Sequence, residues 1–182
     1  MGWKAIKEHY RIDHLVHVRE GLICIGSPFI PDIIKLNQFG QFVKRYERGS
    51  ILSKNDLLSR YMAEMEADPD KCRELAQAED TFAVSIPVYT YDIYDEARII
   101  ECACEELGYP NVTHDGQLMY ENTFSPDRAK VVKWAIKNAR ARVESLKKHQ
   151  VEARENLVKA TDLLRVAESN CQRLLTAEGT NA

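Results

Sequence analysis

The sequence predicts an α+β protein in which a small antiparallel β-sheet with short helices precedes a long C-terminal coiled-coil helix. Three observations predict this class. β-prone runs separated by turn residues occupy positions 11–46, short helical patterns follow, and no Gly or Pro interrupts residues 127–178. We therefore expect an α+β globular domain over residues 1–124, the coiled-coil helix over 125–178 and a disordered tail over 179–182.

Four short strands are expected near the start of the chain. The β-prone runs cover residues 12–18, 22–25, 30–36 and 41–46. Glu20-Gly21, Gly26-Ser27-Pro28 and residues 37–40 separate them, and these residue types are typical of turns. The pattern predicts a small, twisted antiparallel meander.

Two short helices are expected next. Ser53, with Asp56 three residues later, predicts a capping box at the start of the first. Its buried side is predicted to comprise Leu57, Leu58, Tyr61, Met62 and Met65. Asp68-Pro69 ends that helix and begins the second, because Asp suits the cap and Pro the first turn. The apolar face of the second helix is Cys72, Leu75 and Ala76.

The segment between these helices and the C-terminal helix is expected to contain a strand, a helix and a strand. Residues 82–91 alternate in polarity, and Pro87 favours an edge position. Residues 95–107 predict a helix, because apolar residues recur there at helical spacing. These residues are Ile99, Ile100, Ala103, Cys104 and Leu107. A turn at Asp115-Gly116 then precedes a strand over 117–124, and Ser125-Pro126-Asp127 supplies a cap for the last helix.

The most informative pattern is a heptad seam in that last helix. Apolar or small residues recur at alternating steps of four and three, and only Gln150 among them is polar. The seam consists of Val132, Ile136, Ala139, Val143, Leu146, Gln150, Ala153, Leu157, Ala160, Leu164, Ala167, Cys171 and Leu174. It would span roughly 63 Å, whereas the ~125 preceding residues would form a body about 30 Å across. Although the first turns could pack along their own domain, much of the seam needs another helix.

The charges near the seam favour an antiparallel homodimer. Residues 126–178 hold twelve Lys or Arg and seven Asp or Glu, and the rest of the chain has a net charge of −8. A parallel pair would stack the basic stretch 128–148 against itself, whereas an antiparallel pair sets it against residues 155–178, where acids slightly outnumber bases. Alanine at four seam positions lets the helices approach closely, and Gln150 near the midpoint would fix the register.

The same basic stretch supports an alternative function as a nucleic-acid-associated protein, because clustered Lys and Arg on a helix suit a phosphate backbone. The candidate contacts are Lys130, Lys133, Lys137, Arg140 and Lys147. The coiled-coil interpretation accounts for the same charges, since Arg140 and Lys147 flank the seam and Lys and Arg stems cover apolar surface there. With an acidic body attached, we favour protein association.

We predict no catalytic, cofactor-binding or metal-binding residues. His9, His14 and His17 are close in sequence, but a strand over 12–18 would point the last two to opposite faces. Cys102-Ala103-Cys104 lacks the spacing of a redox or zinc pair, and on a helix these thiols would lie about 200° apart. His114-Asp115 is explained by turn chemistry. A small hydrolase or nuclease using one of the four histidines is the third hypothesis.

Composition indicates a reduced protein of the cytoplasm. The five cysteines are odd in number and scattered, which argues against a disulfide framework. The longest purely apolar run, residues 22–25, is too short to cross a membrane. No signal-peptide pattern opens the chain, and Ile6 stands where a myristoylation motif requires Ser or Thr.

The segment YPNVTHDGQLMYENTF, residues 109–124, resembles one that recurs in small uncharacterised bacteriophage and prophage proteins before a long charged C-terminal helix. Gly2-Trp3-Lys4 and residues 25–29 are similar in kind, so the resemblance covers about a third of the chain. It implies a virus-encoded accessory protein of the host bacterial cytoplasm that binds and redirects a host factor. We therefore expect a non-enzymatic homodimer that modulates or inhibits a host protein, for example as an anti-defence or anti-CRISPR inhibitor.

Overall fold

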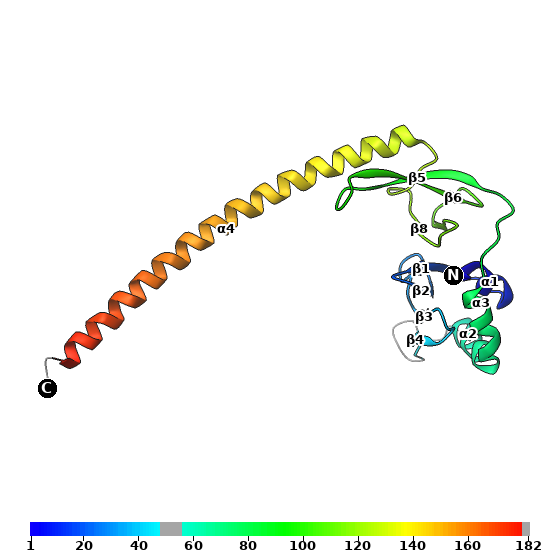
Figure 1. The fold of residues 1–182 in the computed structure, drawn as a ribbon, viewed down its shortest axis with the longest axis horizontal. Helices are drawn as coiled ribbons and strands as arrows, with labels where there is room; N and C mark the ends of the chain where they lie inside the picture. The colour runs from blue at the N-terminus through cyan, green and yellow to red at the C-terminus, as the bar shows by residue number, and fades with distance from the viewer. Residues whose placement is uncertain (48–55, 180–182) are drawn as a thin grey trace. The chain divides into compact units, whose positions relative to one another are not determined.

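An α+β fold is present in the computed structural model, which describes residues 1–47 and 56–179 and their side chains as far as Thr176. The chain divides into two units, residues 1–133 and 134–182. The first unit contains small antiparallel sheets and short helices, and the second is most of one long helix (Figure 1). The predicted fold class is therefore confirmed, whereas the pairing of the long helix with another stays a prediction.

The predicted meander is a four-stranded antiparallel sheet. Its strands are β1 (Leu15–Arg19), β2 (Leu22–Gly26), β3 (Ile34–Leu36) and β4 (Phe42–Lys44), paired in chain order. Val16, Ile25 and Ile34 face one another across three strands, and all three are buried. β-branched residues on one face give the sheet its apolar side.

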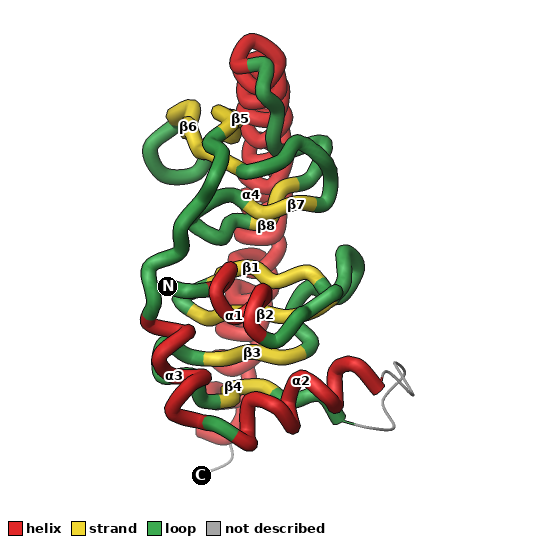
Figure 2. Tube along the Cα trace, turned by 90° about the vertical axis from the view of Figure 1, so that its right-hand side faces the viewer, coloured by secondary structure: helices red, strands yellow, loops and turns green. Residues whose placement is uncertain are grey.

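Three helices lie together on one side of this sheet (Figure 2). They are α1 (Trp3–His9), α2 (Asp56–Ala67) and α3 (Pro69–Gln77). Ile6, Tyr61 and Cys72 come one from each helix and are buried in the same core as the sheet residues. The predicted second helix is confirmed, with the Asp68 carboxylate accepting a hydrogen bond from the third residue of α3 at 2.9 Å.

Two details of the helices differ from the sequence predictions. The helix α1 was not predicted, and Leu57, expected on the buried side of α2, is exposed. The capping box proposed at Ser53 lies outside the described residues.

The prediction of a helix over 95–107 is wrong. Strands β5 (Ile86–Asp92) and β6 (Arg98–Cys104) form an antiparallel hairpin, with Ile100 opposite Thr90 and Cys102 opposite Val88. Ile99 and Ile100 are β-branched, and pairing along seven residues of β5 overrides the helical spacing of the apolar positions. Cys102 and Cys104 therefore lie on the same face of a strand rather than about 200° apart on a helix.

The neighbouring strand predictions are shortened. Residues 82–85 precede β5 rather than belonging to it, and the expected strand over 117–124 is only β8 (Leu118–Met119), paired with β7 (Asn111–Val112). Val88, Cys104, Met119 and Phe124 form a second, smaller core. This core draws on residues far apart in sequence, which local patterns do not reveal.

The long helix is α4 (Arg128–Gly179), a continuous and gently curved element (Figure 1). It begins at Arg128, three residues after the predicted start, and the capping side chain is that of Asp127 and not of Ser125. The Asp127 carboxylate accepts hydrogen bonds from the backbone N–H groups of Ala129 (2.8 Å) and Lys130 (3.2 Å). Among the described helices, α4 included, none combines the length and apolar character needed to span a bilayer.

Candidate interaction surfaces

The heptad seam lies on α4, and most of it is exposed. Every residue from Arg140 to Thr176 is exposed, including Leu157 at 68% and Leu164 at 59%. Nearer the start of the helix, Val132 is half-buried, and the fully buried residue there is its neighbour Val131. The exposed part of the seam therefore runs mainly through the later part of the helix.

Additional apolar residues lie on α4 outside the seam. Val151, Val158, Leu163, Val166 and Leu175 are all more than half exposed. A single partner helix laid along the seam would leave several of them in water. A larger assembly is therefore the main alternative to a pair.

The candidate nucleic-acid contacts are also exposed on α4. At 100° per residue, the five Lys and Arg side chains from Lys130 to Lys147 fall within an arc of roughly 100° around the helix axis. Glu144 lies within the same arc and forms an ion pair of 2.9 Å with Lys147. The structure therefore aligns the predicted cations on one side of the helix, but an acid interrupts the row.

The histidines do not converge. His17 is buried in β1, with its Nε2 3.0 Å from the carbonyl oxygen of Pro31, whereas His14 packs edge-on against Tyr61. Burial lowers the pKa of His14. His9 is exposed beside its neighbouring tyrosine, and the His114 ring contacts a backbone carbonyl. Within residues 1–47 and 56–179, no group of three or more His, Cys, Asp or Glu side chains could hold a metal ion.

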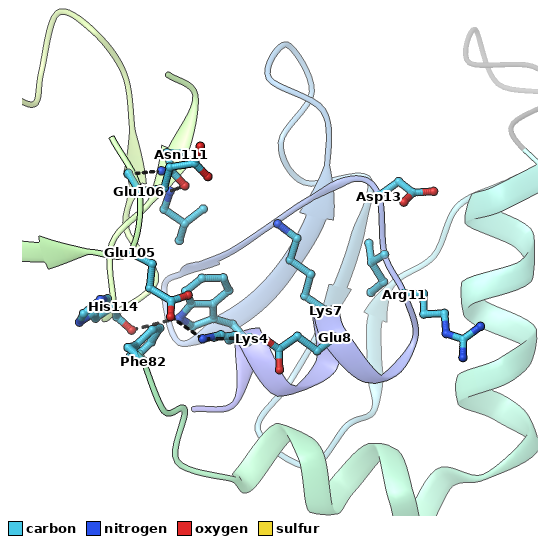
Figure 3. Close-up of a pocket in the computed structure, with 13 residues that line it drawn as sticks. Lys4, Lys7, Glu8, Arg11, Asp13, Phe82, Glu105, Glu106, Asn111 and His114 are labelled. Carbon is cyan, nitrogen blue, oxygen red and sulfur yellow. Dashed lines mark hydrogen bonds and ion pairs between the residues drawn. The ribbon is translucent and has the colours of Figure 1, made fainter. Parts of the chain in front are cut away.

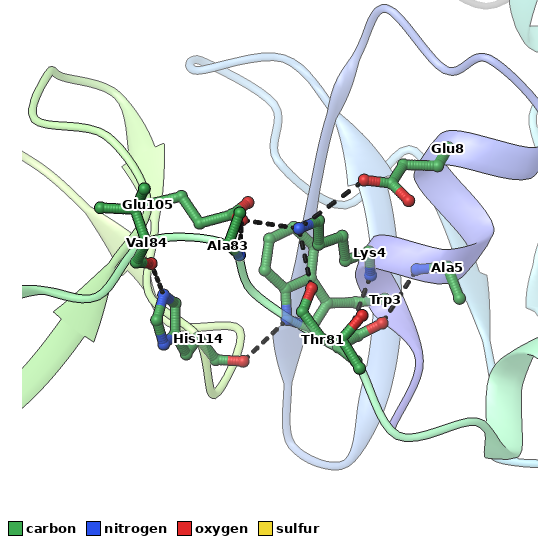
Figure 4. A network of polar contacts seen from close by, with 10 residues as sticks. Trp3, Lys4, Ala5, Glu8, Thr81, Ala83, Val84, Glu105 and His114 are labelled. Atoms are coloured by element: carbon green, nitrogen blue, oxygen red, sulfur yellow. Dashed lines mark hydrogen bonds and ion pairs between the residues drawn. The ribbon is translucent and has the colours of Figure 1, made fainter.

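A polar network that the sequence did not predict joins α1 to Glu105, the residue that follows β6 (Figure 4). The Lys4 ammonium donates to the Glu105 carboxylate at 2.7 Å and lies 4.9 Å from the centroid of the Phe82 ring. Phe82 stacks on His114 at 3.8 Å, and the Trp3 indole N–H donates to the His114 carbonyl at 3.1 Å. The hydrogen bond from Lys4 lowers the pKa of Glu105. Each of these groups has a partner within the network, so the network links the N-terminal helix α1 to the end of the β5–β6 hairpin.

The same residues form one wall of a cleft of about 360 Å³ (Figure 3). Lys7, Glu8, Arg11 and Asp13 line its other side, from α1 and the turn after it. Both signs of charge are present, and Lys4 forms ion pairs with Glu105 (2.7 Å) and with Glu8 (3.7 Å).

A second exposed apolar feature is the turn after β2. Phe29 at its tip is 94% exposed. The turn is held by a hydrogen bond from Ser27 N–H to the Ile30 carbonyl (2.8 Å) and one from Ile30 N–H to the Ser27 hydroxyl (3.0 Å). The Tyr120 hydroxyl also donates to the Pro28 carbonyl at 3.2 Å. An exposed aromatic side chain on an ordered turn is typical of an anchor at protein interfaces.

Comparison with known proteins adds no assignment. The chain matches no protein-family model, no curated protein and no solved structure.

Proposed function

We propose that this chain is a non-enzymatic, phage-type interaction protein that pairs with a second copy through α4 and binds a host protein through its N-terminal unit. Binding would modulate or inhibit that host protein in the bacterial cytoplasm, and inhibition of a host defence complex is the class that the phage-like segment favours. The observation that carries the proposal is the exposed seam of α4.

The exposed seam supports self-association because its residues contribute little to the stability of a single chain. Leu157, Leu164 and Leu174 are each at least 59% exposed, although a large apolar surface is unusual in a protein that remains monomeric. Burying one such side chain stabilises an assembly by about 1.5–3 kcal/mol when burial is complete. The regular spacing of these residues matches a helix as the partner.

The N-terminal unit supports binding to a second protein. Residues 1–125 have a net charge of −8, which suits a basic target such as a nucleic-acid-handling complex. Phe29 supplies an aromatic side chain whose turn is already ordered, so little entropy would be lost on binding. A dimer would present two such units, and two linked sites increase avidity for a repetitive or multimeric target.

Light scattering of the purified protein tests the association. We expect twice the monomer mass for the wild type and the monomer mass for Leu164→Asp. Val166→Asp is the matched control, because Val166 is similarly exposed at 53% but lies outside the seam. A monomeric wild type with an intact α4 would refute the proposal.

An affinity pull-down from bacterial lysate tests host binding. We expect one host protein to be retained by the wild type, retained less by Leu164→Asp because avidity is lost, and lost with Phe29→Ala. Equal retention by all three proteins would contradict the proposed roles of Phe29 and of the dimer.

The alternative function as a nucleic-acid-associated protein is favoured by the alignment of five cations on one side of α4. Binding of fluorescent DNA and RNA, measured by anisotropy at increasing salt, separates the two functions. A phosphate-binding helix predicts a steep loss of affinity with salt and weaker binding of a Lys133→Glu, Lys137→Glu double variant. Absence of binding at low salt would eliminate this alternative.

A further inference from the structure

We infer that the second copy on α4 lies antiparallel in one register, with its midpoint between Leu157 and Ala160, so that facing seam residues have numbers that sum to 317. This inference rests on the proposed self-association. It moves the midpoint away from Gln150, and three features of the helix support it.

The first feature is the exposed length of the seam. Between Arg140 and Thr176, where every residue is exposed, the first seam residue is Val143 and the last is Leu174. An antiparallel pair that covers this whole stretch places Val143 opposite Leu174 of the second copy. The overlap is roughly 47 Å at 1.5 Å per residue.

The second feature is the alternation of large and small side chains. In this register the facing pairs are Val143 with Leu174, Leu146 with Cys171, Gln150 with Ala167, Ala153 with Leu164 and Leu157 with Ala160. Each alanine faces a larger side chain, which fills the layers evenly. A parallel pair would place each residue opposite itself, so Ala153, Ala160 and Ala167 would each face a second alanine in an underfilled layer.

The third feature is the single acid beside the seam. The positions that directly flank the exposed seam hold Arg140, Arg142, Lys147, His149, Arg154, Asn156, Thr161, Leu163, Glu168, Asn170 and Leu175. In the inferred register Glu168 flanks Lys147 of the other copy, and symmetry repeats the contact. Shifting the register by one heptad toward the start of α4 brings Arg154 against itself, whereas a parallel pair sets Arg142 against Lys147. The charges therefore disfavour a parallel pair and a shift toward the start of α4, whereas a shift toward the end would leave Val143 and Leu146 uncovered.

Cys171 is a built-in reporter of this register. It is exposed, and in the inferred pair it faces Leu146, so Leu146→Cys should form a disulfide with Cys171 of the second copy on mild oxidation. Within one chain these positions are roughly 37 Å apart, so the link can only be intermolecular. We expect covalent dimers for Leu146→Cys, identified by mass spectrometry of the 146–171 peptide, and none for the wild type.

Controls separate the other arrangements. Ala139→Cys reports a register shifted by one heptad, and Val151→Cys reports a position outside the seam; neither should cross-link. A Cys171–Cys171 disulfide in the wild type would overturn the antiparallel orientation, and cross-linking of Ala139→Cys in place of Leu146→Cys would overturn the register. A wild type that is monomeric by light scattering would instead refute the proposed association itself.

A charge reversal tests the register without introducing a cysteine. Lys147→Glu should weaken the dimer severalfold, because two acids then face each other, and adding Glu168→Lys should restore the affinity. In a parallel pair the same Lys147→Glu change would face Arg142 and strengthen the dimer, so the sign of the effect decides the orientation. Lys148→Glu, on the outer side of the helix, is the matched control and should change the affinity little. A dimer strengthened or unchanged by Lys147→Glu would overturn the inference.

Discussion

The substitution Leu157→Ala is predicted to weaken self-association about a hundredfold. Leu157 is 68% exposed in the single chain, so a partner helix can still remove most of its side chain from water. Deleting three carbon atoms at about 0.8 kcal/mol each, scaled by that exposed share, costs about 1.5 kcal/mol per copy. Two copies lose about 3 kcal/mol, which corresponds to roughly two orders of magnitude in dissociation constant.

Sedimentation equilibrium over a dilution series measures this change, and circular dichroism checks that α4 remains helical. Val158→Ala is the matched control, because Val158 is the next residue, is 62% exposed and lies outside the seam. Both substitutions introduce alanine, which favours helix, so a loss of helicity is not expected. Equal dissociation constants for the two variants would refute the seam as the contact surface.

Further predictions concern the N-terminal unit and the thiols. Gly116→Ala should destabilise the unit more than Gly21→Ala, by about 1–3 kcal/mol in the free energy of unfolding measured with urea. Both glycines have positive φ, but only a Cβ at Gly116 would lie 2.4 Å from a valine side chain. Glu105→Gln should be less stable than the wild type at neutral pH. The pKa of Glu105 is lower in the folded protein than in an unfolded chain, where it is about 4.3, so the ionised carboxylate stabilises the fold above about pH 4.3. This stabilisation is lost as the pH falls through the folded-state pKa. The free energies of unfolding of the two proteins should therefore converge below about pH 4. At pH 8 and low protein concentration, iodoacetamide should modify the exposed Cys171 first. The other cysteines are buried or half-buried, and burial raises the pKa of Cys102 to about 11. Modification of all five cysteines at equal rates would contradict the described burial.

The long helix was predictable because its signals are local. The segment itself contains no Gly or Pro over residues 127–178, begins with the capping acid Asp127 and carries the seven-residue repeat. The meander was predictable for the same reason, since turn residues separate its β-prone runs. The seam, as the candidate site, was therefore already recognisable in the sequence, although which part of it is exposed was not.

The N-terminal helix and strand β6 could not be predicted, because their stability depends on distant residues. The helix α1 has no side-chain cap from Gly2, and the Asp80 carboxylate accepts the N–H groups of Lys4 and Ala5 instead. In β6, apolar residues at helical spacing suggested a helix, and only their pairing with β5 shows the strand. The network around Lys4 and Glu105 depends on both of these elements, so it could not be predicted from the sequence either.

The network around Lys4 acts within one chain, whereas the later part of the seam of α4 is exposed. The network should therefore affect folding stability, and the seam should affect association. Around Lys4 the charges, aromatic rings and carbonyls pair with one another, so their interactions stabilise the folded unit. Along α4 from Val143 to Leu175 the large apolar residues are exposed, so they contribute mainly when another helix covers them. Substitutions at Glu105 should therefore change the free energy of unfolding at any protein concentration, whereas substitutions at Leu157 should act mainly on the concentration dependence, because only they alter a contact between molecules.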